Sequence, residues 1–389
     1  MPRIANRVAG FGTTIFTEIN QLAAQHHAIY LGQGRPDFDG PGEAIEAFAD
    51  AVTNGQFNQY APGPGVPSLR EQIARHAATQ YALDVDPGAG VLVTPGATEA
   101  IFAAIMGLVD PGDEVIVFEP YFDSYVPGIQ MAGAIPVYVP LRAPDWTFEP
   151  DELRAAFSPR TRALILNTPH NPTGRVLNRA ELTHISELCL EHDVAVISDE
   201  VYEHLVFDDA RHIPIATLPG MFERTLTIGS AGKTFGMTGW KIGWAYGHNA
   251  LMQGIAQAHQ FIAFATNHPA QVAVAHAFSL PEAYFDAYRR LYTRKRDLMM
   301  DGLNAAGLKA LTPEGTYFVM ADFTDVFDGD DTAFAHYLIR EIGVACVPPA
   351  SFYSPQHRDL AASHVRFAFC KSDDTLRAAA ERLAALKAR

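Results

Sequence analysis

The sequence predicts an α/β protein in which helices cover both faces of a mainly parallel sheet, with a second, smaller α+β domain attached. Between residues 91 and 246, short β-branched runs alternate with amphipathic segments of helix length, which is typical of such a sheet. After about residue 280 this alternation gives way to one long helical stretch and further strands. The chain of 389 residues is also longer than one hydrophobic core usually sustains. We therefore expect two domains.

We divide the chain into an N-terminal arm (residues 1–40) that joins the small domain, a large domain (41–280) that carries the binding site, and a small C-terminal domain (281–389). In the arm, a helical patch over Ile15–Ala24 leads into the segment Leu31–Pro41, which is dense in glycine and proline. Such a segment is typical of chain that wraps over another part of the protein.

In the large domain, the loop Asn58–Pro67 is followed by Ser68, whose hydroxyl we expect to cap the helix Leu69–Tyr81. The expected strands are Val91–Thr94, Glu114–Phe118, Ile135–Val139, Ala163–Asn167, Val194–Ser198, Thr225–Ile228 and Ile242–Tyr246. The expected helices between them are Thr98–Val109, Asp123–Ala132 and Arg179–His192. Ligands of parallel sheets bind beyond the carboxyl ends of the strands, so the residues that follow each strand are the site candidates.

The small domain is expected to begin with one long helix and to end with another. The predicted elements are the helix Pro281–Ala306, the strands Gly315–Asp322, Val344–Val347 and Val365–Phe369, and the helix Asp373–Lys387.

Composition and charge exclude several classes of function. The chain has 29 basic and 44 acidic residues, a formal charge of −15, which repels nucleic acid and anionic membranes. No uninterrupted apolar stretch is long enough to span a membrane, and the N-terminus lacks the apolar core of a secretory signal. The cysteines Cys189, Cys346 and Cys370 show no metal-ligand spacing. We expect a cytoplasmic protein with free thiols and no metal site.

One lysine, Lys233, stands in a turn of small residues between two apolar runs (RTLTIGSAGKTFGMTGWKIGWAYG, residues 224–247). Glycines admit a ligand closely, and apolar walls lower the pKa of an amine. We interpret Lys233 as an amine that forms a Schiff base with an aldehyde cofactor.

A nucleotide-binding phosphate loop is the rival interpretation of this stretch. That loop needs a glycine where Thr227 stands, and its acidic strand should follow the lysine, whereas Ala195–Glu200 precedes it.

Two strand ends supply candidates for contact with a cofactor ring. Asp199 would pair a protonated pyridine nitrogen, because a buried carboxylate needs a cation; capping of a following helix is the alternative. Asn171, in NTPHNPTG, would donate a hydrogen bond to a phenolate oxygen on the ring, and Tyr202 would share that oxygen. Ordinary turn chemistry is the alternative for Asn171. We interpret His170 as a packing or solvated residue.

A helix that begins in PGATEA predicts a phosphate site, since the first amides of a helix lack partners within it. Ala97 and Thr98 would bind the phosphate through backbone amides and the threonine hydroxyl. Ser230 and Lys241 could complete the site. A helix that begins at glycine and binds no ligand is the alternative.

An aromatic cluster and a buried arginine are further candidates. In EPYFDSY, Phe122 could lie flat on a planar ring, although Tyr121 and Tyr125 are equally expected to pack in a core. Arg366 stands in the apolar strand HVRFAF, where an arginine is placed to bind a carboxylate with both terminal nitrogens. That carboxylate could belong to the protein or to a substrate.

Together these motifs resemble the fold-type I pyridoxal-phosphate aminotransferases of class I. NPTG, SDEVY, SAGKTFGMTGWKIGW and VRFAF occur in the order and rough spacing of that family, and the resemblance covers essentially the whole chain. LGQGRPDF, NQYAPGPGVPSLR, EPYFDSY and Lys241 are similar to the branch that holds kynurenine, glutamine and methionine aminotransferases.

The resemblance implies pyridoxal 5′-phosphate as cofactor and Lys233 as the Schiff-base lysine and proton shuttle. It also implies that Asp199 pairs the pyridinium nitrogen and that Arg366 binds the α-carboxylate of the substrate beside the backbone of Gly34. The remaining implied roles are tuning of the ring oxygen by Asn171 and Tyr202, stacking by Phe122, and phosphate binding by Ala97, Thr98, Ser230 and Lys241.

The resemblance further implies a homodimer with shared active sites. Phe16 would line the side-chain pocket from the arm, and Tyr60 and Phe264 would reach in from a partner subunit. One residue departs from the branch: Ala265 stands where members that accept aromatic or glutamine side chains often carry a histidine. This departure leaves the side-chain preference open.

The predicted function is the transfer of an amino group from a neutral, sulfur-containing or aromatic L-amino acid to a 2-oxo acid by a ping-pong mechanism. Methionine, glutamine and kynurenine are examples of such donors. The alternatives are a cysteine-conjugate C–S β-lyase, which needs the same lysine, and a succinyldiaminopimelate aminotransferase. A non-enzymatic cofactor sensor within a regulator would need a basic helix-turn-helix region, and we expect none in this chain.

Overall fold

The computed structural model describes residues 3–54 and 57–388. Residues 1, 2 and 389, at the ends of the predicted arm and small domain, lie outside the described residues. The central sheet contains β2 (Val91–Thr94), β3 (Glu114–Glu119), β4 (Ile135–Pro140), β5 (Thr161–Asn167), β6 (Ala195–Asp199), β7 (Thr225–Ser230) and β8 (Gly243–Gly247). Their order across the sheet is β2-β8-β7-β6-β5-β3-β4. Only β8 runs antiparallel to its neighbours, which confirms the mainly parallel sheet.

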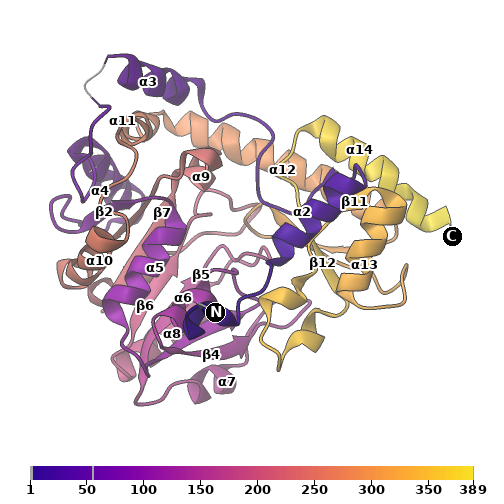
Figure 1. Ribbon diagram of the computed structural model, residues 1–389, viewed down its shortest axis with the longest axis horizontal. Coiled ribbons are helices and arrows are strands. Elements are labelled where there is room, and N and C mark those ends of the chain that lie inside the picture. Colours follow the sequence, from indigo (N-terminus) through magenta and orange to yellow (C-terminus); the bar gives the residue numbers. More distant parts are fainter. Residues whose placement is uncertain (1–2, 55–56, 389) are drawn as a thin grey trace.

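Helices cover both faces of the central sheet (Figure 1). Alternate residues of a strand face opposite layers. In β5, Ala163 and Ile165 pack with α5 (Ala97–Leu108), α6 (Tyr125–Met131) and α10 (Asn249–Ile262). Leu164 and Leu166 pack on the other face with α7 (Pro150–Ala155) and α8 (Arg179–Glu191). The helices α4 (Pro67–Tyr81) and α11 (His268–Ala277) cover the end of the sheet at β2. The strands are therefore apolar on both faces, as their unbroken β-branched runs predicted.

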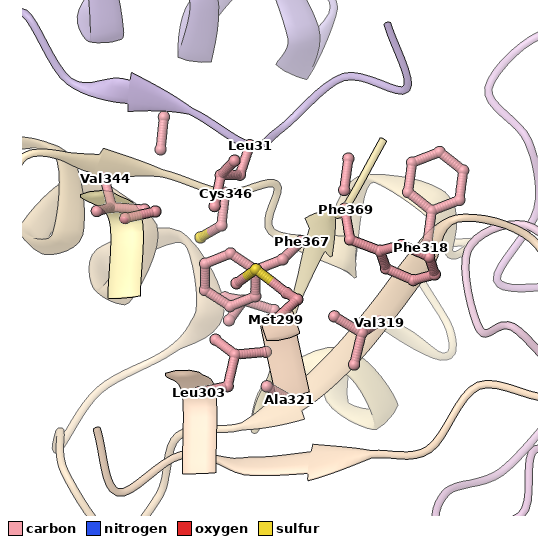
Figure 2. Close-up of a cluster of buried hydrophobic side chains, with 14 of the residues drawn as sticks. Leu31, Met299, Leu303, Phe318, Val319, Ala321, Val344, Cys346, Phe367 and Phe369 are labelled. Carbon is pink, nitrogen blue, oxygen red and sulfur yellow. The ribbon is translucent and has the colours of Figure 1, made fainter. Parts of the chain in front are cut away.

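The C-terminal part has its own antiparallel sheet. It contains β9 (Lys309–Leu311), β10 (Phe318–Asp322) and β12 (His364–Ala368) in the order β12-β10-β9. The helices of this part are α12 (Glu282–Ala305), α13 (Asp331–Tyr337), the π-helical η4 (Leu338–Ile342) and α14 (Asp373–Leu383). Figure 2 shows its core, where Met299 and Leu303 of α12 face Val319 of β10 and Phe367 of β12.

The N-terminal arm packs against this C-terminal part. Its strand β1 (Ile29–Tyr30) pairs in parallel with β11 (Val344–Ala345), and Leu31 belongs to the core drawn in Figure 2. In Figure 1 the arm helix α2 (Ile15–Gln25) lies beside the C-terminal elements β11 and α14. The three-part division of the chain nevertheless stays a prediction, because these contacts do not fix its boundaries.

Several boundaries differ from the predicted ones. Helix α4 begins at Pro67 with Val66 as its N-cap, so the prediction that Ser68 is the cap was wrong; a proline fits the first helical position because its missing N–H needs no partner there. Strand β10 begins only at Phe318, since the amides of Gly315 and Thr316 bond to Gly174 and Leu205 instead. Strand β11 ends at Ala345.

The structure also contains three helices that were not predicted, α3 (Gly42–Thr53), α10 and α11. The remaining short elements are α1 (Asn6–Ala9), α9 (Ala231–Thr234), η1 (Ile215–Thr217), η2 (Phe222–Arg224), η3 (Thr238–Trp240), η5 (Pro349–Phe352), η6 (Arg358–Ala361) and η7 (Ala384–Ala388). None of the helices in the described residues combines the length and the apolar character that crossing a membrane requires.

Candidate active site

A cavity of about 720 Å³ collects nearly all of the predicted site residues. Tyr60 and Phe264 are the exceptions. The predicted residues that line it are Phe16, Gly34, Ala97, Thr98, Phe122, Asn171, Asp199, Tyr202, Ser230, Lys233, Lys241 and Arg366. The parallel strands β5, β6 and β7 end at this cavity, as expected for a sheet whose ligand sites lie beyond the carboxyl ends of its strands.

Lys233 lies in the short helix α9, which follows β7 directly. Its Nζ donates a hydrogen bond to the Tyr317 hydroxyl at 2.6 Å, and that hydroxyl donates to the carbonyl oxygen of Gly34 at 2.8 Å. The rings of Tyr202 and Tyr317 lie 5.7 and 5.2 Å from Nζ. Burial lowers the pKa of Lys233 to about 8. A substantial fraction of the amine is therefore neutral near physiological pH, as a nucleophile or a base requires.

Asp199, the last residue of β6, is a buried carboxylate without a cation partner. It accepts hydrogen bonds from the Tyr125 hydroxyl at 2.6 Å and from the amide of Val201 at 3.4 Å. No basic side chain in residues 3–54 and 57–388 forms an ion pair with it. Burial raises the pKa of Asp199 to about 6, and the Tyr125 hydrogen bond opposes this rise. A protonated ring nitrogen would supply the missing cation, so the site fits a pyridine cofactor at this point.

The alternative role for Asp199, capping of a following helix, does not fit the structure. Residues 201–204 form turns rather than a helix, so there is no helix start for the carboxylate to cap.

Arg366 is a buried cation without an acidic partner. Its Nη1 and Nη2 donate to Asn171 Oδ1 and to the carbonyl oxygen of Gly32, both at 2.8 Å, while its Nε has no hydrogen-bond partner. The guanidinium carbon lies 4.0 Å from the centre of the Phe318 ring and 5.4 Å from that of Phe16. No carboxylate of the described residues approaches the guanidinium within 4 Å. A protein carboxylate is thus not its partner, and the group can bind the carboxylate of a ligand in the cavity.

Hydrogen bonds hold both the backbone and the side chain of Asn171. Its backbone amide donates to Asn167 Oδ1 at 2.8 Å, and its own Oδ1 accepts from Arg366. The Nδ2 amide therefore keeps its hydrogens for a group in the cavity, which fits the predicted donation to a ring oxygen.

The start of helix α5 forms a site for an anion. Gly96 precedes it with φ of +81°, and no side chain caps the first amides. The Nζ of Lys241 lies against Gly96, where an added Cβ would come within 3.1 Å of it. A Cβ at Gly243 would lie 2.4 Å from the amide nitrogen of Ala97, so only glycine lets this strand approach the helix start. Free amides beside an ammonium group fit a phosphate.

The structure distinguishes the aromatic residues of EPYFDSY. Phe122 lines the cavity, whereas Tyr121 stacks on Tyr138 outside it, with ring centres 6.0 Å apart. Tyr125 is buried, and its hydroxyl holds Asp199. Phe122 is therefore the member of this cluster that is placed to cover a ring.

Tyr60 and Phe264 lie together outside the cavity. Their rings meet edge to face at 5.4 Å, and their exposed fractions are 82% and 44%. Phe264 has φ of +66°, a strained conformation for a bulky residue. Ala265 lines a separate hollow with Tyr60. Within one chain these residues do not reach the cavity.

Two residues that contact the predicted ones were not among the site candidates. Tyr317 bonds to Lys233 from a segment that was predicted only as strand, and Tyr125 was expected only to pack in a core. No local pattern distinguishes either residue from a core tyrosine, because each meets its partner across a large separation in sequence.

Comparisons with known proteins agree with this geometry. The family model for aminotransferase class I and II matches residues 26–383. A probable N-succinyldiaminopimelate aminotransferase, DapC, of Mycobacterium tuberculosis is 46% identical, over 99% of this chain and 98% of its own. Kynurenine–oxoglutarate transaminase 3 of Rattus norvegicus is 41% identical, over 97% of this chain and 89% of its own.

Solved structures are similar over the same length. The N-succinyldiaminopimelate aminotransferase of M. tuberculosis superposes with a TM-score of 0.95 at 46% identity, over 99% of this chain and 100% of that one. YbdL of Escherichia coli, with a methionine aminotransferase function, gives 0.93 at 41% identity with the same coverage. These matches confirm the predicted fold-type I architecture. The chain belongs to the class I and II aminotransferases and is a pyridoxal-phosphate-dependent transaminase.

Proposed function

We propose that the cavity binds pyridoxal 5′-phosphate through the predicted residues and exchanges amino groups between L-amino acids and 2-oxo acids there. When bound, the cofactor supplies an aldehyde that condenses with amines and a protonated ring that withdraws electrons. The observation that carries this proposal is the pair of buried, unpaired charges on Asp199 and Arg366, which face one cavity with the Lys233 amine. Such charges are expensive unless ligands pair with them.

Each residue then has a defined task. Asp199 holds a proton on the ring nitrogen, and the helix α5 start with Lys241 binds the phosphate. Arg366 binds the α-carboxylate of the substrate, which orientates the substrate Cα toward the Lys233 side of the cavity. Lys233 Nζ would accept the proton that the substrate Cα loses and, as an ammonium group, would be the proton donor on that side of the cavity; a pKa of about 8 suits an amine for both roles.

The amino donor is a neutral, sulfur-containing or aromatic L-amino acid in this proposal, as the resemblance implied. A second candidate is N-succinyldiaminopimelate, because relatives from M. tuberculosis at 46% identity carry that name. The E. coli neighbour with methionine aminotransferase function supports the first candidate.

We also propose a cytoplasmic homodimer with shared active sites. Tyr60 and Phe264, whose rings contact each other, expose 82% and 44% of their surface, an unusual amount for a pair of aromatic residues. A partner subunit would cover them and bring Tyr60 and Phe264 to the neighbouring cavity. Light scattering after size-exclusion chromatography tests this assembly, and a monomeric active enzyme would contradict it.

The experiment that tests the site has two steps. The purified protein is loaded with pyridoxal 5′-phosphate, reduced with borohydride and digested, and the modified peptide is identified by mass spectrometry. We expect modification at Lys233. The loaded enzyme is then offered a panel of L-amino acids that includes methionine, glutamine, kynurenine and N-succinyldiaminopimelate, and the 2-oxo acids formed are measured. Modification at another lysine, or no oxo acid from any donor, would overturn the proposal.

A further inference from the structure

The loop of residues 32–40, which connects the arm to the large domain, is held by hydrogen bonds at Arg35 and at the residues just before it. Gly32 O accepts from Arg366 and Gly34 O accepts from the Tyr317 hydroxyl, each at 2.8 Å. The carbonyl oxygen of Arg35 itself accepts from Lys371 Nζ at 2.6 Å. The backbone position of Arg35 is therefore fixed relative to the cavity.

The side chain of Arg35 is free in comparison. It is exposed, it lines the cavity, and it has no ion pair in the described part of the chain. Asp39, four residues on, also lines the cavity but does not come within 4 Å of the guanidinium. The other cations of the lining, Lys233, Lys241 and Arg366, already have proposed tasks. Arg35 is thus a cation in the wall of the cavity that forms no ion pair with any described residue.

Arg35 lies within reach of a substrate that Arg366 holds. Gly32 contacts the Arg366 guanidinium, and three residues of extended chain span at most about 10 Å between Gly32 and Arg35. An amino acid whose α-carboxylate binds Arg366 would therefore extend its side chain into a cavity whose wall includes a second arginine within that distance. Asp39 and Asp123 also line this space, and they would repel an anionic side chain if no cation were present.

We propose that Arg35 is a specificity-determining residue that binds a second acidic group, a carboxylate on the side chain of the amino donor or of the oxo-acid acceptor. This inference rests on the proposed function. It assigns to the site a substrate class that includes dicarboxylic amino acids and acylated amino acids with a distal carboxylate. A guanidinium binds a carboxylate with two parallel hydrogen bonds, which a neutral amide cannot reproduce.

Glutamate and glutamine test the proposal because they have the same length and differ at the distal group. The ratio of kcat/KM for glutamate to that for glutamine is measured with the loaded wild-type enzyme and with Arg35→Gln, Arg35→Lys and Arg35→Glu. We expect Arg35→Gln to lower this ratio about tenfold or more, Arg35→Lys to lower it less, and Arg35→Glu to lower it most. Arg179→Gln is the matched control, since Arg179 is exposed on α8 and lies outside the cavity lining.

A binding measurement separates recognition from turnover. Calorimetry with the loaded enzyme compares glutarate, which has two carboxylates, with its monoamide, and neither compound can be transaminated. We expect wild type to prefer glutarate and Arg35→Gln to lose that preference. Equal loss for both compounds would show that Arg35 only positions the loop, and an unchanged preference would show that it does not contact the ligand. Either result overturns the proposal, whereas a wild type that is inactive with every amino acid would refute the proposed function instead.

Discussion

Two neighbouring regions bury acidic residues from the same stretch of chain in opposite ways. In the cavity, Asp199 forms no ion pair with any residue that the structure describes, and burial raises its pKa to about 6. One residue later, Glu200 turns to the interior, where it bonds to His212 at 2.8 Å and to Ser198 at 2.7 Å. Glu203 likewise bonds to His76 at 3.0 Å and to the Tyr81 hydroxyl.

The pKa values reflect the difference. Burial acts to raise the pKa of Glu203, but the neighbouring histidines and the hydrogen bonds from His76 and Tyr81 outweigh it and hold that pKa well below its usual range. Burial of Asp199 meets no comparable compensation. Asp199 and Glu203 are both buried, so burial alone does not identify a charge that has a function. A buried charge that the protein leaves unpaired marks the place where a ligand supplies the partner.

The largest expected effect is on Lys233. Lys233→Ala should lower transamination at least about 10⁴-fold, because nucleophilic and proton-transfer contributions disappear together. Oxo-acid formation in single-turnover assays measures the loss. Lys309→Ala is the control, since Lys309 is exposed and pairs only with Asp325 at the surface. Near-normal turnover in Lys233→Ala would mean that another amine performs the chemistry.

Asp199→Asn and Glu203→Gln break the comparison directly. Asp199→Asn should lower kcat about 10²- to 10³-fold, because the positive charge on the ring loses its fixed partner, and should not lower folding stability, because it removes a buried carboxylate that forms no ion pair. Glu203→Gln should instead cost about 3–5 kcal/mol of unfolding free energy, because His76 is left buried without its partner. Urea denaturation and steady-state kinetics measure both quantities. Equal effects of the two variants on activity would contradict the distinction.

The pH dependence of stability should carry the signature of Asp199. Its folded-state pKa of about 6 exceeds the ordinary 3.8, so the folded protein binds this proton more tightly than the unfolded chain does. The resulting stability is fully present below pH 3.8 and is lost as the pH rises through about 6. Cofactor-free wild type should therefore lose about 2 kcal/mol relative to Asp199→Asn between pH 4 and pH 7. Parallel stability curves for the two proteins would refute the unpaired state.

Arg366→Lys tests whether Arg366, the second buried charge, binds the carboxylate of the substrate. A lysine keeps the charge but cannot bind Asn171, Gly32 and a carboxylate with fixed planar geometry. We therefore expect kcat/KM to fall about 30- to 150-fold, which corresponds to about 2–3 kcal/mol, mainly through a higher KM. Arg377→Lys on α14, where Arg377 is exposed and pairs with Asp374, should leave both constants within a factor of about two. A fall in kcat at constant KM would argue against carboxylate binding.

The smallest expected effect concerns Tyr317. Tyr317→Phe removes the acceptor that holds the free Lys233 amine, so kcat should fall about fivefold to tenfold, the equivalent of one hydrogen bond, with little change in KM. The pH at which the cofactor-free lysine becomes reactive toward an amine reagent should also fall, because the ammonium form loses a hydrogen-bond acceptor. Tyr292→Phe removes a hydroxyl from the neighbouring stacked ring and should change neither property. Identical effects of both variants would reduce Tyr317 to a packing role.

The sequence sufficed for the fold class and the family, and both are confirmed. Strand runs such as Ala163–Asn167 are apolar on both faces, and that property needs no knowledge of tertiary contacts. The start of α4 was misjudged because serine and proline give competing signals there, and proline prevailed. Strand β10 was overextended because Thr316 bonds to a distant loop, which no local pattern records.

For the site, the sequence identified residues that follow strands, and the structure gathers them around one cavity; their roles toward the cofactor stay predictions. The local sequence pattern suffices to place Asn171, Asp199 and Lys233 after strands, and parallel strands bring their carboxyl ends to one edge of a sheet. Only the tertiary structure decided which charges are paired. Asp199 and Glu200 are adjacent in sequence, yet His212 bonds to Glu200, whereas Asp199 forms no ion pair within residues 3–54 and 57–388. The reason is that partners are set by packing between segments far apart in the chain.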